Sequence, residues 1–290
     1  MSTIEKAIEK AGKSDYVANK GSAKPVVDQQ EQPSFITAEH EIPLEQGEKL
    51  DQQRIGIDFA AFAKLGMLVP GEENPLTEEY RMIKRPLLLN AFGVNEIKHS
   101  NLILVTSSMP GEGKTFTAIN LALSIAMERD KTVLLVDADI AKSSIASVFN
   151  IESKHGLLDI LEDDQLEFSD ILVKTEIANL GIIPAGRRHK HSTEILASDA
   201  MIRFTDELSS RYPDRIVIFD SPPLLAATES AVLASHVGQI VFVIESENTP
   251  QYVVRQALSK IQSCEVIGCV LNKVKHGFSV GYYYGYKYDN

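Results

Sequence analysis

Six short apolar runs recur along the chain, and segments with the spacing of helices separate them. The runs are apolar on both faces, as is typical of strands covered on both sides of a sheet. We expect strands at NLILVT (101–106), TVLLVD (132–137), LGIIPA (180–185), RIVIFD (215–220), QIVFVIE (239–245) and EVIGCVLN (265–272). We expect helices around 114–129, 156–162, 192–210, 227–236 and 250–262. This alternation predicts an α/β fold with a mainly parallel sheet flanked by helices.

The chain is expected to have three parts. Residues 1–75 are predicted to be a flexible N-terminal extension, residues 76–273 the folded domain and residues 274–290 a tyrosine-rich tail. Most of the extension is rich in Gln, Glu, Lys and Ser, so it cannot bury enough apolar surface to offset the entropy lost on ordering. Two stretches differ: residues 2–12 have helical spacing, and the apolar patch IDFAAFAKLGMLVP (57–70) is expected to dock on the core or on a partner.

A charged segment, TEEYRMIKR (77–85), opens the folded domain and has helical spacing. On spacing alone, Glu78 and Arg81 form a pair on a solvated helix face, worth only ~0.2–0.5 kcal/mol. Pro86 lacks the N–H that would bond back to Met82, so a helix stop or a kink is expected there.

The formal net charge of −11 excludes several classes of partner. It argues against a non-specific nucleic-acid binder and against a polybasic membrane anchor. No run approaches the ~20 apolar residues of a membrane helix, and MSTIEKAIEKAGK lacks the apolar centre of a signal peptide. We therefore expect a cytoplasmic protein with no direct membrane insertion, which a partner could recruit to the inner face of the membrane. Cys264 and Cys269 are expected to be reduced thiols.

The segment SSMPGEGKT (107–115) follows the first predicted strand and fits the P-loop pattern G-x-x-x-x-G-K-[ST], with Ser108 at the first glycine. Backbone N–H groups of such a loop and the N-terminus of the next helix bind phosphate oxygens. Lys114 would reach the β- and γ-phosphates, and the Thr115 hydroxyl would bind Mg²⁺. A glycine-rich turn can also simply join a strand to a helix, but the strand–loop–helix context favours ATP and Mg²⁺ as cofactors. The predicted nucleotide contacts in the loop are Pro110, Gly111, Glu112, Gly113, Lys114, Thr115 and Phe116.

Three aspartates end two of the predicted strands. Asp137 and Asp139 close VLLVDAD, and Asp220 closes RIVIFD. Acidic residues often end strands as ordinary turn formers, but ligands of open α/β sheets bind outside the carboxyl ends of the strands. Beside a P-loop, these carboxylates predict Mg²⁺ ligands at Asp139 and Asp220, together with Thr115. Asp137 is the candidate base, so Lys114, Asp137 and Asp139 form the predicted catalytic set.

The C-terminal sequence GYYYGYKYDN holds five of the nine tyrosines of the chain. Such a tail cannot build a core, so it either docks on a surface or is modified. A phenol has a pKa near 10, so a kinase that modifies it must position the hydroxyl and accept its proton. The tyrosines concerned are Tyr282, Tyr283, Tyr284, Tyr286 and Tyr288.

A DxD strand combined with a strand that ends in DSPP resembles the MinD/ParA-like P-loop ATPases. Partitioning members of that group carry a signature lysine before the loop glycines, where this chain has Met109. The chain is similar, over about residues 76–290, to a branch without that lysine, the bacterial tyrosine kinases (BY-kinases) of capsule and exopolysaccharide synthesis. The long extension and the tail look closest to the stand-alone kinases of exosortase-linked loci.

The resemblance implies an ATP-dependent autokinase that phosphorylates its own tyrosine tail within a homo-oligomeric ring or stack. It implies subunit contacts by an E-x-x-R-x-x-R helix, here Glu78, Arg81 and Lys84, with lysine at the third position. It places Asn272 near the adenine. The implied partners are a membrane polysaccharide co-polymerase that activates the kinase and a cognate tyrosine phosphatase. Twelve extended residues from Asn272 to Tyr284 span at most ~40 Å, enough to reach a neighbouring site.

Two other functions stay open on the sequence. One is a MinD/ParA-like ATPase that acts as a nucleotide-gated positioning or scaffolding switch and needs no tail tyrosines. The other is a binding module whose tail stacks on a partner. A basic loop, RRHKH (187–191), could hold a metal through its two histidines, but a solvated loop, or one that meets phosphate or an acidic neighbour, is favoured.

Overall fold

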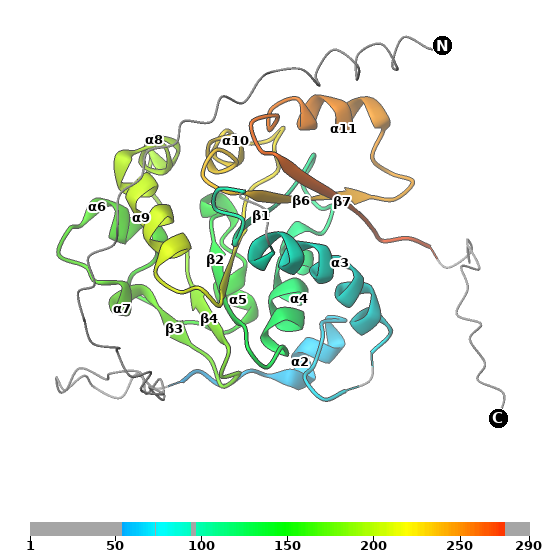
Figure 1. Cartoon of the computed structure of the whole chain (residues 1–290), viewed down its shortest axis with the longest axis horizontal. Coiled ribbons are helices and arrows are strands. Elements are labelled where there is room, and N and C mark those ends of the chain that lie inside the picture. Colours follow the sequence, from blue (N-terminus) through cyan, green and yellow to red (C-terminus); the bar gives the residue numbers. More distant parts are fainter. Residues whose placement is uncertain (1–53, 73, 94–96, 276–290) are drawn as a thin grey trace, which may run out of the picture. The chain divides into compact units, whose positions relative to one another are not determined.

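The computed structural model describes residues 54–72, 74–93 and 97–275. Their centre is a seven-stranded sheet with the order β3-β4-β2-β5-β1-β6-β7 (Figure 1). The strands are β1 (Leu102–Ser107), β2 (Thr132–Asp137), β3 (Val173–Lys174), β4 (Leu180–Ile183), β5 (Arg215–Asp220), β6 (Gln239–Glu245) and β7 (Val266–Asn272). All neighbours pair in parallel except β3, which runs antiparallel to β4. The predicted α/β class with a mainly parallel sheet is therefore confirmed.

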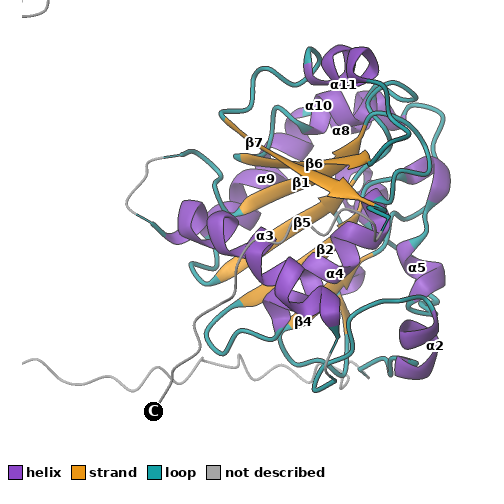
Figure 2. Ribbon diagram, turned by 90° about the vertical axis from the view of Figure 1, so that its right-hand side faces the viewer, coloured by secondary structure: helices purple, strands orange, loops and turns teal. Residues whose placement is uncertain are grey.

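Helices cover both faces of the sheet (Figure 2). The helices are α2 (Phe59–Lys64), α3 (Pro75–Phe92), α4 (Lys114–Ala126), α5 (Ile145–Val148), α6 (Leu157–Glu162), α7 (Phe168–Ile171), α8 (Ser192–Leu196), α9 (Asp199–Ser210), α10 (Glu229–Leu233) and α11 (Gln251–Leu258). Alternate residues of β1 serve the two faces: Ile103 and Val105 pack in one core cluster with α2, α3 and α4, and Leu102 and Leu104 in the other with α6, α8 and α9. This double burial explains the continuous apolar runs.

The folded part begins before the expected boundary at residue 75. Residues 54–72 are described, and Ile55 donates from its backbone N–H to Lys174 at the edge of the sheet. Phe62 and Leu68 are both only 1% exposed in the core cluster beside α4. The predicted boundary is therefore too late. Of the two sites expected for the apolar patch, the core or a partner, the structure shows packing on the core. The predicted helix at 2–12 lies outside the described residues.

Pro86 does not stop its helix: α3 continues from Pro75 to Phe92. Met82, whose carbonyl loses the bond from Pro86, is 61% exposed, and Pro86 is exposed as well. Because both lie on the solvent side, water can satisfy the free carbonyl. Of the expected stop or kink, the stop is therefore wrong. The stretch expected as helical at 192–210 also differs, since it divides into α8 and α9.

Candidate nucleotide site

The loop from β1 to α4 has the backbone that its glycines allow. Gly111 and Gly113 have φ of +91° and +97°, in the left-handed region that residues with a Cβ rarely adopt. A Cβ on Gly113 would also lie 2.0 Å from Asn272 Nδ2. Gly113 precedes Lys114, the first residue of α4, so the free N–H groups at this helix end face the loop. The strand–loop–helix arrangement that the sequence predicts is therefore present.

Glu112 anchors this loop from within. Its side chain is buried and accepts a hydrogen bond from the Met109 N–H at 2.7 Å and another from the Thr249 hydroxyl. Asn272, the last residue of β7, donates from Nδ2 to the Glu112 carbonyl at 2.9 Å. The loop is thus tied to the segment that follows β6 and to the end of β7. Asn272 lies against the loop, beside the predicted phosphate contacts.

Lys114 lies between two of the predicted aspartates. Its Nζ is 2.6 Å from Asp139 Oδ2 and 3.9 Å from Asp220 Oδ1. β5 pairs with both β1 and β2, in a register that places Asp220 opposite Val105 and Asp137. The parallel strands therefore bring the P-loop lysine and the three aspartates to one edge of the sheet, as the sequence predicts.

Asp137 is fully buried at the end of β2. Burial raises the pKa of its carboxyl to about 6, although hydrogen bonds from the Ser143 hydroxyl and the Ile145 and Asp139 N–H groups oppose the rise. A carboxylate with a pKa near 6 can accept a proton close to neutral pH. Because Asp137 has no exposed surface, a substrate hydroxyl reaches its carboxylate only when the residues that cover it, such as Ser143, move.

Asp220 is fully buried, and neither of its carboxylate oxygens has a hydrogen-bond partner among the described residues. Burial raises its pKa to about 7, although the charge of Lys114 and then the adjacent Thr115 hydroxyl, which forms no hydrogen bond of normal geometry with it, oppose the rise. A buried carboxylate without donors needs a proton or a cation. Asp139, in contrast, already accepts from Lys114 and from the Lys142 N–H at 3.0 Å. Of the predicted Mg²⁺ ligands, Asp220 therefore fits a cation best.

No group of three or more His, Cys, Asp or Glu side chains in the described part of the chain is arranged to hold a metal by itself. This is compatible with Mg²⁺, which proteins usually bind through one or two carboxylates and the phosphates of the nucleotide. His189 and His191 of the basic loop instead lie near Glu162 and Glu194, at 3.4 Å and 4.0 Å.

The three predicted subunit-contact residues differ in their exposure to solvent. Glu78 and Arg81 are exposed on α3 and pair with each other at 3.0 Å. Lys84 is buried instead, and its Nζ lies 2.6 Å from the Ser124 carbonyl oxygen and 2.6 Å from Glu128 Oε1. The ammonium group of Lys84 is therefore used inside the chain, and its contact with another subunit stays a prediction. The five tail tyrosines lie outside the described residues.

Sequence reasoning missed the residues that hold the site from a distance. Thr249, which binds Glu112, and Ser143, which binds Asp137, belong to loops with no motif of their own. Lys273 was also missed; its Nζ donates to the Gly111 carbonyl at 2.7 Å. Only its place beside Asn272 at the end of a predicted strand could have indicated it.

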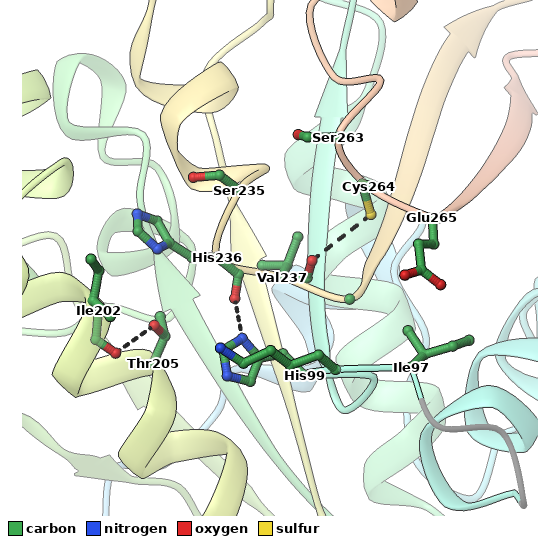
Figure 3. Close-up of a pocket in the computed structure, with 12 residues that line it drawn as sticks. Ile97, His99, Ile202, Thr205, Ser235, His236, Val237, Ser263, Cys264 and Glu265 are labelled. Atoms are coloured by element: carbon green, nitrogen blue, oxygen red, sulfur yellow. Dashed lines mark hydrogen bonds between the residues drawn. The ribbon is translucent and has the colours of Figure 1, made fainter.

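A cavity of about 390 Å³ lies at the amino ends of β1, β6 and β7 (Figure 3). His99 and His236 line it, and His99 Nδ1 is 3.0 Å from the His236 carbonyl oxygen. Cys264, on the other side, is a free thiol. Because the P-loop follows the carboxyl end of β1, this cavity is not part of the nucleotide site.

Comparisons with known proteins agree with this geometry. The model of a family described as an AAA domain matches residues 100–267. The putative tyrosine-protein kinase EpsB of Ralstonia nicotianae is 31% identical over 216 residues, which cover 74% of this chain and 27% of EpsB. The tyrosine-protein kinase YwqD of Bacillus subtilis is 30% identical over 214 residues, which cover 71% of this chain and 86% of YwqD.

A solved structure, that of the chimerical protein CapA2B2, superposes with a TM-score of 0.64 at 26% identity, and the match covers 76% of this chain and 92% of that one. The chain thus spans about a quarter of the length of EpsB but most of YwqD and of the chimera. The P-loop, the paired aspartate strands and these relatives together show that the chain belongs to the AAA domain family and, within it, to the bacterial tyrosine-protein kinases.

Proposed function

We propose that this chain is an ATP-dependent protein-tyrosine autokinase that phosphorylates its own C-terminal tyrosine cluster. The observation that carries the proposal is the meeting of Lys114, Asp137 and Asp220 at the P-loop edge of the sheet, in a chain with five tyrosines near its end. The kinase names of the relatives support the same class of reaction. The nucleotide would be held by residues 110–116 and by Asn272.

In the proposed reaction, the tyrosine oxygen forms a bond to the γ-phosphorus of ATP while the bond to the β,γ-bridging oxygen breaks and ADP leaves. The phenolic proton passes to Asp137, whose raised pKa suits this acceptance. Lys114 is placed to neutralise charge on the phosphates. Bound Mg²⁺ would supply further charge neutralisation, and the Thr115 hydroxyl and the donor-free carboxylate of Asp220 are the groups that fit it.

The direct test is to incubate the purified chain with Mg·ATP and to map phosphate by mass spectrometry. We expect phosphate within residues 282–288, and none in a Lys114→Met variant or in a variant with phenylalanine at all five tail tyrosines. ATP hydrolysis without tail phosphate would refute the autokinase and favour the MinD/ParA-like ATPase switch.

We further propose that transfer occurs in trans, between chains of a homo-oligomer. The test mixes two defective chains: Lys114→Met with an intact tail, and an intact site with the five-phenylalanine tail. Phosphate on the tail of the Lys114→Met chain requires transfer between chains. If neither chain is modified in the mixture although the parent is, transfer occurs within one chain.

The cellular role is also a proposal. We propose that the kinase regulates exopolysaccharide or capsule synthesis and export. A membrane co-polymerase would activate it, and a cognate tyrosine phosphatase would remove the phosphates that it adds. In the part of the chain that the structure describes, no helix has the length and apolar character needed to cross a bilayer. Recruitment to the inner face of the membrane would then depend on the activator.

A further inference from the structure

A second, smaller cavity lies at the end of the sheet opposite the P-loop. Its volume is about 200 Å³, and its lining includes the first residues of β2, β4 and β5. Three cationic side chains line it, and we call this cavity the cationic pocket: Arg54, Lys174 and Arg215. Asp137 and Asp220 lie at the carboxyl ends of β2 and β5, and the P-loop follows the carboxyl end of β1, so the cationic pocket is separate from the nucleotide site.

None of the three cations forms an ion pair with a carboxylate among the described residues, although the chain carries a net charge of −11. Two carboxylates close to these cations in the sequence form hydrogen bonds of their own, although the charge of Asp214 also acts on Arg215. Asp214 accepts a hydrogen bond from the Thr132 hydroxyl at 3.2 Å, and Glu176 accepts one from the Ile57 N–H.

Tyr212 holds the Arg215 guanidinium in place, but one of its nitrogen atoms has no hydrogen-bond acceptor among the described residues. Its guanidinium carbon lies 3.7 Å from the centre of the Tyr212 ring, which fixes the plane of the group. Its Nη1 is buried and has no hydrogen-bond partner in the described part of the chain. A buried donor without an acceptor is costly, so the pocket is poised for a ligand that brings oxygen acceptors.

The size and the chemistry of the pocket restrict the kinds of ligand that it can bind. A volume of about 200 Å³ is below the ~300–1,000 Å³ of sites for larger ligands, so a whole nucleotide does not fit. Guanidinium groups match phosphate oxygens in a bidentate fork. Leu172 and Leu180 also line the pocket, and a bare ion would not cover these apolar side chains. Phosphate oxygens and an apolar substituent together satisfy both parts of the lining.

We propose that the cationic pocket binds a phosphomonoester group that carries an apolar substituent. A phosphotyrosine side chain has this chemistry, and so does a small phosphorylated metabolite. Binding at this site does not require that the chain be an active kinase.

The test uses isothermal titration calorimetry of the full chain, with saturating Mg·ADP to fill the nucleotide site. Phenyl phosphate, inorganic phosphate and a synthetic GYYYGYKYDN peptide phosphorylated at Tyr284 are the probes. We expect saturable binding of phenyl phosphate that is tighter than that of inorganic phosphate. Tighter binding of the peptide than of phenyl phosphate assigns the site to phosphotyrosine, and equal or weaker binding assigns it to a small phosphoester.

The double variant Arg54→Gln/Lys174→Gln should weaken phenyl phosphate binding at least ~10-fold, because charge-assisted hydrogen bonds are lost. Both side chains are exposed, so the substitutions leave the core intact. Lys64→Gln, at an exposed lysine outside the pocket, is the matched control and should bind as the parent does. The proposal is overturned if binding is absent, if inorganic phosphate binds as tightly as phenyl phosphate, or if the double variant and the control bind alike.

Discussion

Asp220 shows how one residue links the stability of this chain to its function. It has no exposed surface and no donor to its oxygens within the described residues, yet it lies 3.9 Å from Lys114. Folding therefore stabilises its protonated form, whereas binding of a cation requires its ionised form. If Asp220 binds Mg²⁺ as proposed, the cation would offset the free-energy cost of the buried, ionised carboxylate.

This coupling predicts a pH dependence. The pKa of Asp220 is about 7 in the folded chain and ~4 when unfolded, so between these values the folded chain holds a proton that the unfolded chain has released. The free energy of unfolding then falls as the pH rises through this window. Urea denaturation should show Asp220→Asn becoming more stable relative to the parent from pH 5 to pH 8, by up to about 3 kcal/mol. A difference that does not change with pH would contradict the coupling.

The proposed role of Asp137 as the base in phosphate transfer can be tested by substitution. If it accepts the phenolic proton, Asp137→Asn should lower phosphate transfer by ~10²–10⁴-fold while leaving Mg·ATP affinity close to that of the parent. Quench-flow transfer assays and nucleotide titrations measure the two quantities separately. Ser143→Ala, which keeps the carboxylate and removes one hydrogen bond to it, is the matched control and should lose much less. Unchanged transfer in Asp137→Asn would assign the base elsewhere.

The core of the site could be predicted from sequence because its geometry is local. A P-loop needs a fixed spacing of glycines, lysine and threonine, and Asp137 and Asp220 each end a strand that is apolar on both faces. The burial that shifts their pKa values could not be predicted, because it depends on packing between segments far apart in the chain. The contact between Thr249 and Glu112, 137 positions apart, is a further example.

At the scale of elements, α3 shows where local rules give way to tertiary contacts. Pro86 should end a helix, but α3 continues since its neighbours on the other face are buried against the core, including Tyr80, Lys84 and Leu87. Strand positions were predictable for the opposite reason, because each long strand carries its own apolar signal. The two-residue strand β3 carries no such signal, so only its pairing with β4 defines it.

The attachment of α3 to α4 can be tested through Lys84. Replacing it by methionine leaves the Ser124 carbonyl and Glu128 without their partner, so Lys84→Met should lower the free energy of unfolding by about 1–3 kcal/mol. The neighbouring Arg85 is exposed, and Arg85→Met should change stability by less than ~0.5 kcal/mol. Chemical denaturation compares the two, and equal effects would show that the buried contact contributes nothing specific.

The place of α2 in the fold gives a further prediction. Phe62 is 1% exposed, and its ring lies edge-on to Phe149 with 5.1 Å between the centres. Phe62→Ala should therefore cost about 3–5 kcal/mol of unfolding free energy. Leu65 in the same segment is 56% exposed, and Leu65→Ala should cost less than ~0.5 kcal/mol. If Phe62→Ala unfolds like the control in urea, residues 54–72 do not belong to the cooperative unit.

At the scale of the whole molecule, charge should set the assembly state. Phosphorylation of five tyrosines would add about −8 to −10 charges to a chain that already carries −11. We expect repulsion to loosen the oligomer, so native mass spectrometry should find smaller assemblies before phosphatase treatment than after it. The five-phenylalanine tail should be unaffected by phosphatase. The same assemblies before and after treatment would contradict the switch.

The strand order has a consequence for how the protein is made. β5 lies between β1 and β2 in the sheet, but in the chain it follows both of them, after α9. When a ribosome is still adding α9, the nascent chain already contains the P-loop and Asp137. β5, the strand that lies between β1 and β2, has not yet been made. The sheet beside the P-loop therefore stays incomplete until β5 has been made, and a transcript cut before the Asp220 codon yields a chain in which β1 and β2 lack the strand that joins them.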